Sequence, residues 1–269
     1  MSAYPNIDLI LMLQPLLALA ISLGAVILWW LRRGFRGAIL LMSAAAYFVA
    51  IGAKEAIQLP TAASVEAKFG ATSVGLGLYF GLQTVFLEVG LAYLFAVYLA
   101  RSRGLKVTDA VPYGLSLSFW ENGVLLGVFS ILSLGVTYLL LAAGGSEAST
   151  LYYQLVNAQP SVFLPPASLL PTVLIGTLER VSSMLIHTAW GMLCVFSAVS
   201  RRKRYLAYAL PMGLVDALVP FASLNTNLFE GGLFALSLLF VVIARRVAKS
   251  QNEVPLPDSD TPPASPTAL

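Results

Sequence analysis

The chain has 269 residues, of which 58% are hydrophobic and only 11% are charged. Soluble domains carry roughly 25% charged residues, so this composition excludes an ordinary water-soluble protein and predicts an all-α membrane protein. The single cysteine, Cys194, excludes a disulfide-stabilised secreted domain. The basic residues lie at the ends of apolar segments and not along a polar face, which argues against nucleic-acid binding.

Long apolar segments run through most of the chain. A helix needs about 20 mostly apolar residues to cross a hydrocarbon core about 30 Å thick. Seven segments satisfy this requirement, and we expect them to form one seven-helix transmembrane domain over residues 1–249. In chain order the segments are 7–31, 37–58, 75–100, 111–142, 168–200, 205–222 and 228–244.

Clusters of basic residues follow the first, third, fifth and seventh segments. The clusters lie within 32–36, 101–106, 201–204 and 245–249. Lysine and arginine near membrane spans favour the cytoplasmic side, and seven crossings put all four clusters on the same side. We therefore expect the N-terminus outside and the C-terminus in the cytoplasm.

The remaining stretches are predicted to be loops and a tail. Residues 250–269 contain five prolines and no apolar periodicity, which predicts a disordered cytoplasmic tail. Residues 59–74 and 143–167 are rich in small and polar residues and are expected to be outer loops. The second is long enough for a cap, although a plain linker is the simpler interpretation.

Several charged residues near the outer ends of segments are expected to have no functional role. Glu66, Glu147 and Glu230 lie in or near the predicted outer loops, where we expect them to be solvated. Lys54 and Glu55 lie close to the predicted outer end of the second segment. Long charged side chains in such positions extend to the membrane surface.

Other ionisable residues lie well inside the segments, where each costs roughly 2.5–3.5 kcal/mol to insert. They are Glu88, Glu121, Glu179, Arg180, Asp216 and His187, the only histidine. Glu121, Glu179 and Asp216 are ten or eleven residues from an end of their segments, or about 15–17 Å at 1.5 Å per residue. Acids at one depth in several helices predict a shared polar interior.

Helical phase supports such an interior. Arg180 and His187 are seven residues apart and point within about 20° of each other. Thr84 and Glu88 share one face of the third segment, four residues apart. In addition, glycine pairs spaced four apart, at 77 and 81 and at 123 and 127, are expected to let the third and fourth segments approach closely.

This set of residues is consistent with hydrolysis inside the membrane. Glu121 or Glu179 can act as the general base for a water molecule, while Arg180, His187 and Asn122 can stabilise an oxyanion. An aspartate such as Asp216 can orient the imidazole. The alternative is a buried ion-pair network without catalysis, since buried charges of opposite sign tend to pair.

Metal catalysis is the less favoured interpretation. A catalytic zinc usually takes three protein ligands, commonly two of them histidines. The chain has one histidine and lacks the H-E-x-x-H motif. A divalent metal held by Glu121, His187 and Asp216 therefore remains an alternative, and no cofactor is expected.

The same residues resemble a known family. The sequence S-F-W-E-N-G surrounds Glu121, and Glu179, Arg180 and His187 form the pattern E-R, then six residues, then H. The sequence P-M-G-L-V-D ends at Asp216. Over residues 75–222 the chain is similar to YhfC-type membrane proteins. That family is grouped with glutamic-type intramembrane proteases of the CAAX prenyl endopeptidase kind and with the non-catalytic scaffold subunit of γ-secretase.

The resemblance implies a function and a role for each residue. Glu121 is expected to activate water, His187 and Asp216 to polarise or orient it, and Glu179 and Arg180 to form a supporting pair. Two alternatives remain: a catalytically silent scaffold that holds a partner's transmembrane helix, and a proton-coupled carrier that uses acids as a relay. The chain departs from the family pattern in segment six, where Met212 occupies a position at which a histidine is expected.

The resemblance also predicts the surroundings of the chain. We expect an integral multi-pass protein of a prokaryotic plasma membrane. Its partners are expected to be the lipid bilayer and a membrane-embedded protein or peptide substrate, with no nucleic acid. The oligomeric state is left open.

Overall fold

The computed structural model describes residues 5–253, and within this range it contains helices and no strands. The prediction of an all-α membrane bundle is confirmed, because seven helical spans are long and apolar enough to cross a membrane. The elements are η1 (Leu9–Met12), α1 (Leu13–Arg33), α2 (Gly37–Phe69), α3 (Val74–Gln83), η2 (Thr84–Val89), α4 (Gly90–Ser102), η3 (Val107–Asp109), α5 (Ala110–Ser118), η4 (Phe119–Val128), α6 (Phe129–Ala143), α7 (Gly145–Ala158), η5 (Pro160–Phe163), α8 (Pro166–Ser200), α9 (Lys203–Gly213), η6 (Leu214–Leu224) and α10 (Thr226–Glu253).

Three of the seven spans are continuous α-helices, and the others are interrupted. Helices α2, α8 and α10 each form a span alone. The four composite spans consist of η1 and α1; of α3, η2 and α4; of η3, α5, η4 and α6; and of α9 and η6. Elements η2 and η4 are π-helical, and η6 is a 3₁₀ helix. Each of these three interruptions carries one of the acids predicted at mid-membrane depth.

Two of the predicted loops are largely helical. Helix α2 continues through Pro60 to Phe69, so the connection to α3 is much shorter than the predicted loop over 59–74. Residues 61–69 contain three alanines, a glutamate and a lysine, which favour helix even without an apolar run. Within 143–167 the chain forms α7 and η5 instead of a plain linker.

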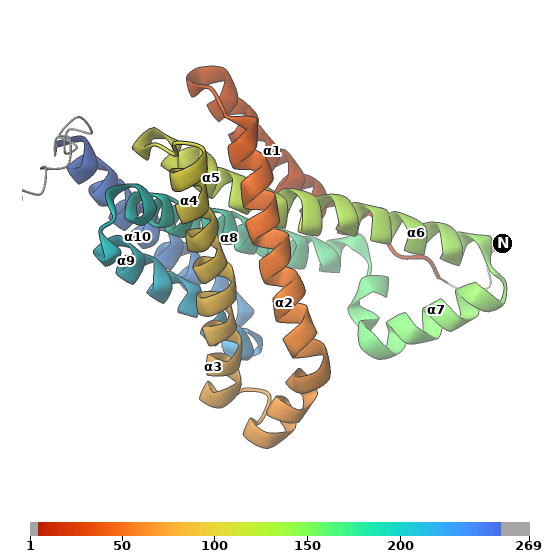
Figure 1. Cartoon of the computed structure of the whole chain (residues 1–269). Helices are drawn as coiled ribbons and strands as arrows, with labels where there is room; N and C mark the ends of the chain where they lie inside the picture. Colours follow the sequence, from red (N-terminus) through yellow and green to blue (C-terminus); the bar gives the residue numbers. More distant parts are fainter. Residues whose placement is uncertain (1–4, 254–269) are drawn as a thin grey trace, which may run out of the picture.

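The hairpin of α6 and α7 projects from the rest of the bundle (Figure 1). The turn between the two helices is made by Gly144 and Gly145, whose φ angles are 74° and 86°. Glycine adopts positive φ at no steric cost. This reversal brings the chain back from α7 through η5 to the start of α8.

Helix α8 is the central element of the bundle. Of its most apolar stretch, 72% is buried, against 39% or less in the other spans. It packs closely against α5, where a Cβ on Gly191 would come within 2.6 Å of Gly114 Cα. Glycine at both positions therefore allows the two backbones to touch.

The two glycine pairs mediate close packing, but with helices other than those predicted. Gly77 and Gly81 of α3 lie against Ala217 in η6. The pair at 123 and 127 in η4 lies against α1, at Ser22 and Leu19. The prediction that they join the third and fourth segments is wrong, because small residues permit close approach without selecting the neighbour.

The end of the chain is described only in part. Helix α10 runs to Glu253, so residues 250–253 of the predicted tail are helical. Residues 254–269 of that tail lie outside the described residues. The expected orientation, with the N-terminus outside, stays a prediction.

Candidate active site

Inside the bundle lies a cavity of about 160 Å³ whose lining includes eight polar side chains. Side chains from α2, η2, η4, α8, η6 and α10 line it. All six ionisable residues that the sequence places inside the segments are among them, together with two further polar side chains. The polar lining consists of Lys54, Glu88, Glu121, Glu179, Arg180, Ser183, His187 and Asp216. The structure thus brings the predicted residues together, while their individual roles stay predictions.

The imidazole of His187 lies between two carboxylates. Its Nε2 is 2.7 Å from Glu121 Oε2 and 3.4 Å from Glu88 Oε2. Its Nδ1 lies 2.9 Å from the carbonyl oxygen of Ser183. Because a carbonyl oxygen only accepts, Nδ1 carries a hydrogen and Nε2 faces the two acids. At least one proton is therefore held between Nε2 and the carboxylate oxygens.

The position of the His187 ring is fixed by packing. The ring contacts Trp190 at a centroid distance of 4.1 Å and Tyr47 at 6.5 Å. The Nε2 atom is buried, and neither carboxylate oxygen is aligned with it for a directional hydrogen bond. The imidazole is thus held in place by its other side, while Nε2 faces the two carboxylates.

Lys54 is the site residue that the sequence analysis missed. Its ammonium lies 2.6 Å from Glu88 Oε1, 2.9 Å from Asp216 Oδ2 and 2.8 Å from Thr84 Oγ1. Three acceptors match the three hydrogens of an ammonium group. The expectation that Lys54 reaches the membrane surface is wrong. Because α2 extends to Phe69, Lys54 lies near the middle of this helix.

Asp216 contacts other residues than expected. The sequence suggested that its carboxylate orients the imidazole, but its Oδ2 accepts hydrogen bonds from Lys54 and Thr84. The Ser183 carbonyl orients His187 instead. The predicted pairing of Thr84 with Glu88 is present, with the hydroxyl 3.3 Å from Oε1. Asp216 therefore belongs, with Glu88 and Thr84, to the group of acceptors around the Lys54 ammonium, beside the imidazole.

Glu121 and Glu179 share Arg180. The guanidinium bonds to Glu179 Oε1, and its Nη1 lies 3.9 Å from Glu121 Oε1. Glu121 Oε2 also accepts a hydrogen bond of 3.2 Å from the Ser183 hydroxyl. Glu121 keeps 17% of its side chain exposed and Glu179 keeps 38%. Glu121 is the more enclosed of the two, and it alone contacts the imidazole.

Asn122 supports the site from behind. Its amide donates to Ser183 Oγ at 3.3 Å, and Ser183 in turn donates to Glu121. Asn122 is fully buried and does not line the cavity. The position of Asn122 therefore does not support its expected role at an oxyanion. Its amide instead orients the Ser183 hydroxyl next to Glu121.

Three of the four acids that line the cavity lie on irregular helical segments. Glu88 is in the π-helical η2, Glu121 in the π-helical η4 and Asp216 in the 3₁₀-helical η6. Short π segments within α-helices often mark functional sites. A changed number of residues per turn rotates the following side chains, so these acids point in directions that a regular helix does not provide.

Glu230 is a further buried acid close to this region. It was expected to be a solvated surface charge, but it is only 5% exposed. Within residues 5–253 its Oε2 has no hydrogen-bond partner. The expectation is wrong because α10 begins at Thr226 and places Glu230 in its first turns.

The donor set fits a metal ion poorly. Among the described residues, no three His, Cys, Asp or Glu side chains form a group that could hold one. The ammonium of Lys54 already occupies the space between Glu88 and Asp216, and Arg180 approaches Glu121. A divalent cation there would face two fixed positive charges. The metal alternative at Glu121, His187 and Asp216 is therefore not supported by this geometry.

Comparison with known proteins agrees with this picture of a membrane-embedded site. The family model described as YhfC intramembrane metalloprotease matches residues 17–244. No curated protein and no solved structure matches the chain. The match covers all or most of each of the seven spans and every polar residue of the cavity. The chain is an integral multi-pass membrane protein that belongs to the YhfC intramembrane metalloprotease family.

Proposed function

We propose that this protein hydrolyses a peptide bond of a membrane-embedded substrate, with Glu121 as the general base. The observation that carries the proposal is the position of His187 Nε2, 2.7 Å from Glu121 Oε2 at the wall of a cavity inside the bundle. An acid next to an imidazole in a dry site is suited to proton transfer. Membership of a family described as intramembrane proteases supports the same reaction.

The first step is the attack of water. Glu121 takes a proton from a water molecule, whose oxygen forms a bond to the carbonyl carbon of the scissile peptide. Negative charge then develops on the carbonyl oxygen. The guanidinium of Arg180, 3.9 Å from Glu121 Oε1, is close enough to stabilise this charge. Such stabilisation is strong where water is largely excluded.

The second step breaks the carbon–nitrogen bond. His187 Nε2 donates its proton to the leaving nitrogen. The proton that Glu121 took from water passes across the 2.7 Å contact to Nε2, and this restores the imidazole. The carbonyl oxygen of Ser183 keeps the imidazole ring in its orientation. One water is consumed and two peptide ends are released.

The reaction is proposed without a step through a metal. The family description names a metalloprotease, but the carboxylates here contact Lys54, Arg180 and His187. Lys54 holds Glu88 and Asp216 in place through ion pairs with both. We assign to it the role of a positioning residue that keeps Glu88 next to the imidazole.

One observation favours a second function. Each of the four carboxylates that line the cavity already contacts a cationic or imidazole group. A paired network of this kind is also what a non-catalytic scaffold needs to stay folded. The second candidate is therefore a protein that holds a partner's transmembrane helix without cleaving it.

A single substitution at Glu121 distinguishes the two functions. The Glu121→Gln variant keeps the size of the side chain and removes its basicity, so it should abolish cleavage of transmembrane peptides in liposomes. The matched control is Glu66→Gln, which changes an exposed acid at the end of α2 and should cleave normally. Cleavage by the Glu121→Gln variant would refute the proposed role. A transmembrane partner that co-purifies with both variants, without cleavage by the native protein, would establish the scaffold.

A further inference from the structure

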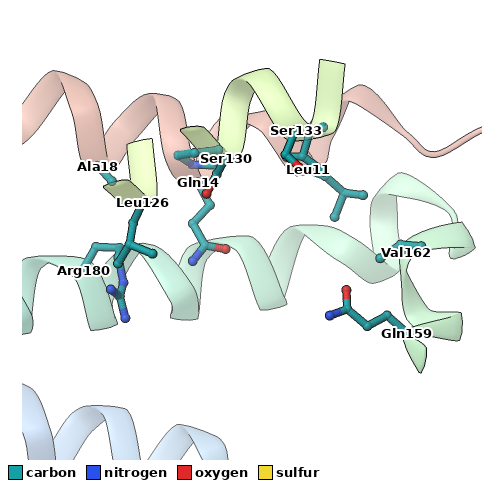
Figure 2. A pocket seen from close by; sticks show the side chains of 11 residues that line it. Leu11, Gln14, Ala18, Leu126, Ser130, Ser133, Gln159, Val162 and Arg180 are labelled. Carbon is teal, nitrogen blue, oxygen red and sulfur yellow. The ribbon is translucent and has the colours of Figure 1, made fainter. Parts of the chain in front are cut away.

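A second cavity lies beside the active site and has about three times its volume, about 470 Å³ against 160 Å³. It is lined by residues of η1, α1, η4, α6, η5 and α8 and by Gln159 just before η5, on the side where α6 and α7 project (Figures 1 and 2). Binding sites for small ligands typically measure about 300–1,000 Å³. The second cavity is within this range, whereas the active-site cavity alone is too small for more than a short part of a peptide.

Arg180 is the one residue that lines both cavities. On one side its guanidinium contacts Glu179 and approaches Glu121. On the other it forms one end of the second cavity, with Gln159 at the opposite end and Gln14 between them (Figure 2). Arg180 is therefore the point at which the second cavity borders the active-site cavity.

The second cavity combines apolar walls with uncharged polar groups. Carboxamides come from Gln14 on α1 and from Gln159 before η5, and hydroxyls come from Ser130 and Ser133 on α6. Within residues 5–253, none of these four side chains has a hydrogen-bond partner among the contacts of the protein. Carboxamides and hydroxyls both donate and accept hydrogen bonds. The cavity thus presents unused donors and acceptors: Gln14, Ser130 and Ser133 lie within membrane spans, and Gln159 lies just outside them.

Gln14 packs against α8 at Gly176, which has no side chain. A Cβ on Gly176 would lie 2.5 Å from Gln14 Nε2 and 2.7 Å from its Oε1. Glycine at this position therefore lets the Gln14 carboxamide lie against α8.

Proteolysis in a membrane creates a need for such groups. In a transmembrane helix every backbone N–H and C=O is satisfied within the helix. A peptide bond becomes open to attack only when the helix unwinds around it, and each freed backbone group then costs several kcal/mol unless it finds a partner. Uncharged groups that donate and accept can supply these partners for any sequence.

We propose that the second cavity binds an unwound segment of the substrate's transmembrane helix and delivers its adjoining peptide bond past Arg180 to Glu121. The substrate class is a transmembrane segment with helix-weakening residues such as glycine and proline and with uncharged side chains. The inference rests on the proposed function, since it names where the same substrate is held. It adds a binding site of which only Arg180 belongs to the catalytic group.

The native chain is well suited to a thiol-protection experiment. Its only cysteine, Cys194, is fully buried and should not react with maleimides in the folded protein. A Ser133→Cys variant places a thiol on the cavity wall. The matched control is Leu132→Cys, because Leu132 is the preceding residue on α6, is 59% exposed and does not line the cavity. Both are made in the Glu121→Gln background, so that the peptide is not consumed.

Maleimide labelling is then measured in liposomes with a transmembrane peptide that carries a central Gly-Pro pair. The expected result is several-fold slower labelling of the Ser133→Cys variant and no change in the Leu132→Cys control. A second peptide in which leucines replace the Gly-Pro pair remains helical and should not protect. Equal protection by both peptides would overturn the inference, because the cavity would then accept intact helices. No protection by either would overturn it too, including the case where lipid fills the cavity.

The experiment distinguishes a failure of the second site from a failure of the proposed function. Cleavage by the native protein without protection of the Ser133→Cys variant would refute the second site and leave the catalytic role of Glu121 intact. Protection without any cleavage by the native protein would refute proteolysis and retain the site for an unwound segment.

Discussion

Lys54 on α2 and Asp216 on η6 form a direct ion pair in the interior of the bundle, with Nζ 2.9 Å from Oδ2. The same ammonium contacts Glu88 on η2, so one lysine joins three spans. A positive charge fixed at this point has two effects: it forms ion pairs with both acids and offsets one of their two negative charges, and it fills the space between them, which leaves no room there for a divalent cation.

Replacement of Lys54 by methionine should destabilise the protein strongly. Breaking a buried ion pair by removing one partner costs about 3–5 kcal/mol, and here two carboxylates lose their cation. The measurement is thermal unfolding in detergent micelles, with Lys68→Met at the exposed end of α2 as the control. Equal unfolding temperatures for the two variants would show that Lys54 has no structural role.

Chelators should leave cleavage unchanged. With Lys54 between Glu88 and Asp216, the proposed reaction uses only side chains of the chain itself. Peptide cleavage is measured before and after dialysis against EDTA, and the metal content of the purified protein is determined by elemental analysis. Activity that disappears on dialysis and returns with a stoichiometric divalent metal would require a different arrangement of Lys54.

The contact between α5 and α8 should tolerate no added methyl group. A Cβ on Gly114 would overlap the backbone of Thr188, and forced overpacking costs typically 1–3 kcal/mol. Gly114→Ala is therefore expected to lower the unfolding temperature. Gly135→Ala in α6, where a Cβ meets nothing within 4 Å, should raise stability by up to about 1 kcal/mol. The reverse order of the two unfolding temperatures would contradict the packing described for α5 and α8.

Replacement of Gln14 by leucine should weaken substrate binding more than the chemical step. Leucine has a similar size but removes the carboxamide from the second cavity. We expect a higher KM for Gly-Pro peptides with little change in kcat, measured by cleavage in liposomes over a range of peptide densities. A fall in kcat at unchanged KM would instead connect Gln14 with the reacting groups.

The number of spans and the identity of most polar residues follow from the sequence for a simple physical reason. Hydrophobic length sets the spans, and an ionisable residue is costly enough in the membrane that Glu121, His187 and Asp216 must face protein or water. This reasoning does not depend on the details of packing. It therefore identifies residues that gather in the interior before their contacts are known.

The partners of these residues were harder to predict. Lys54 was assigned to a helix end because apolarity falls after residue 58, whereas alanine-rich sequence continues α2 to Phe69. Asp216 was paired with His187, but it lies in a 3₁₀ segment that directs it to Lys54. Helix boundaries and irregular turns depend on tertiary packing, and a regular 3.6-residue period does not reveal them.

The central claim is that Glu121 and His187 act as one proton-transfer unit. The most direct measurement is the cleavage rate of the Glu121→Gln and His187→Gln variants and of the double variant, all in liposomes with the same peptide. Residues that act as a unit show strongly non-additive losses, so the double variant should be about as slow as the slower single variant. Losses that multiply in the double variant would mean that the two residues act separately, in contradiction to the mechanism.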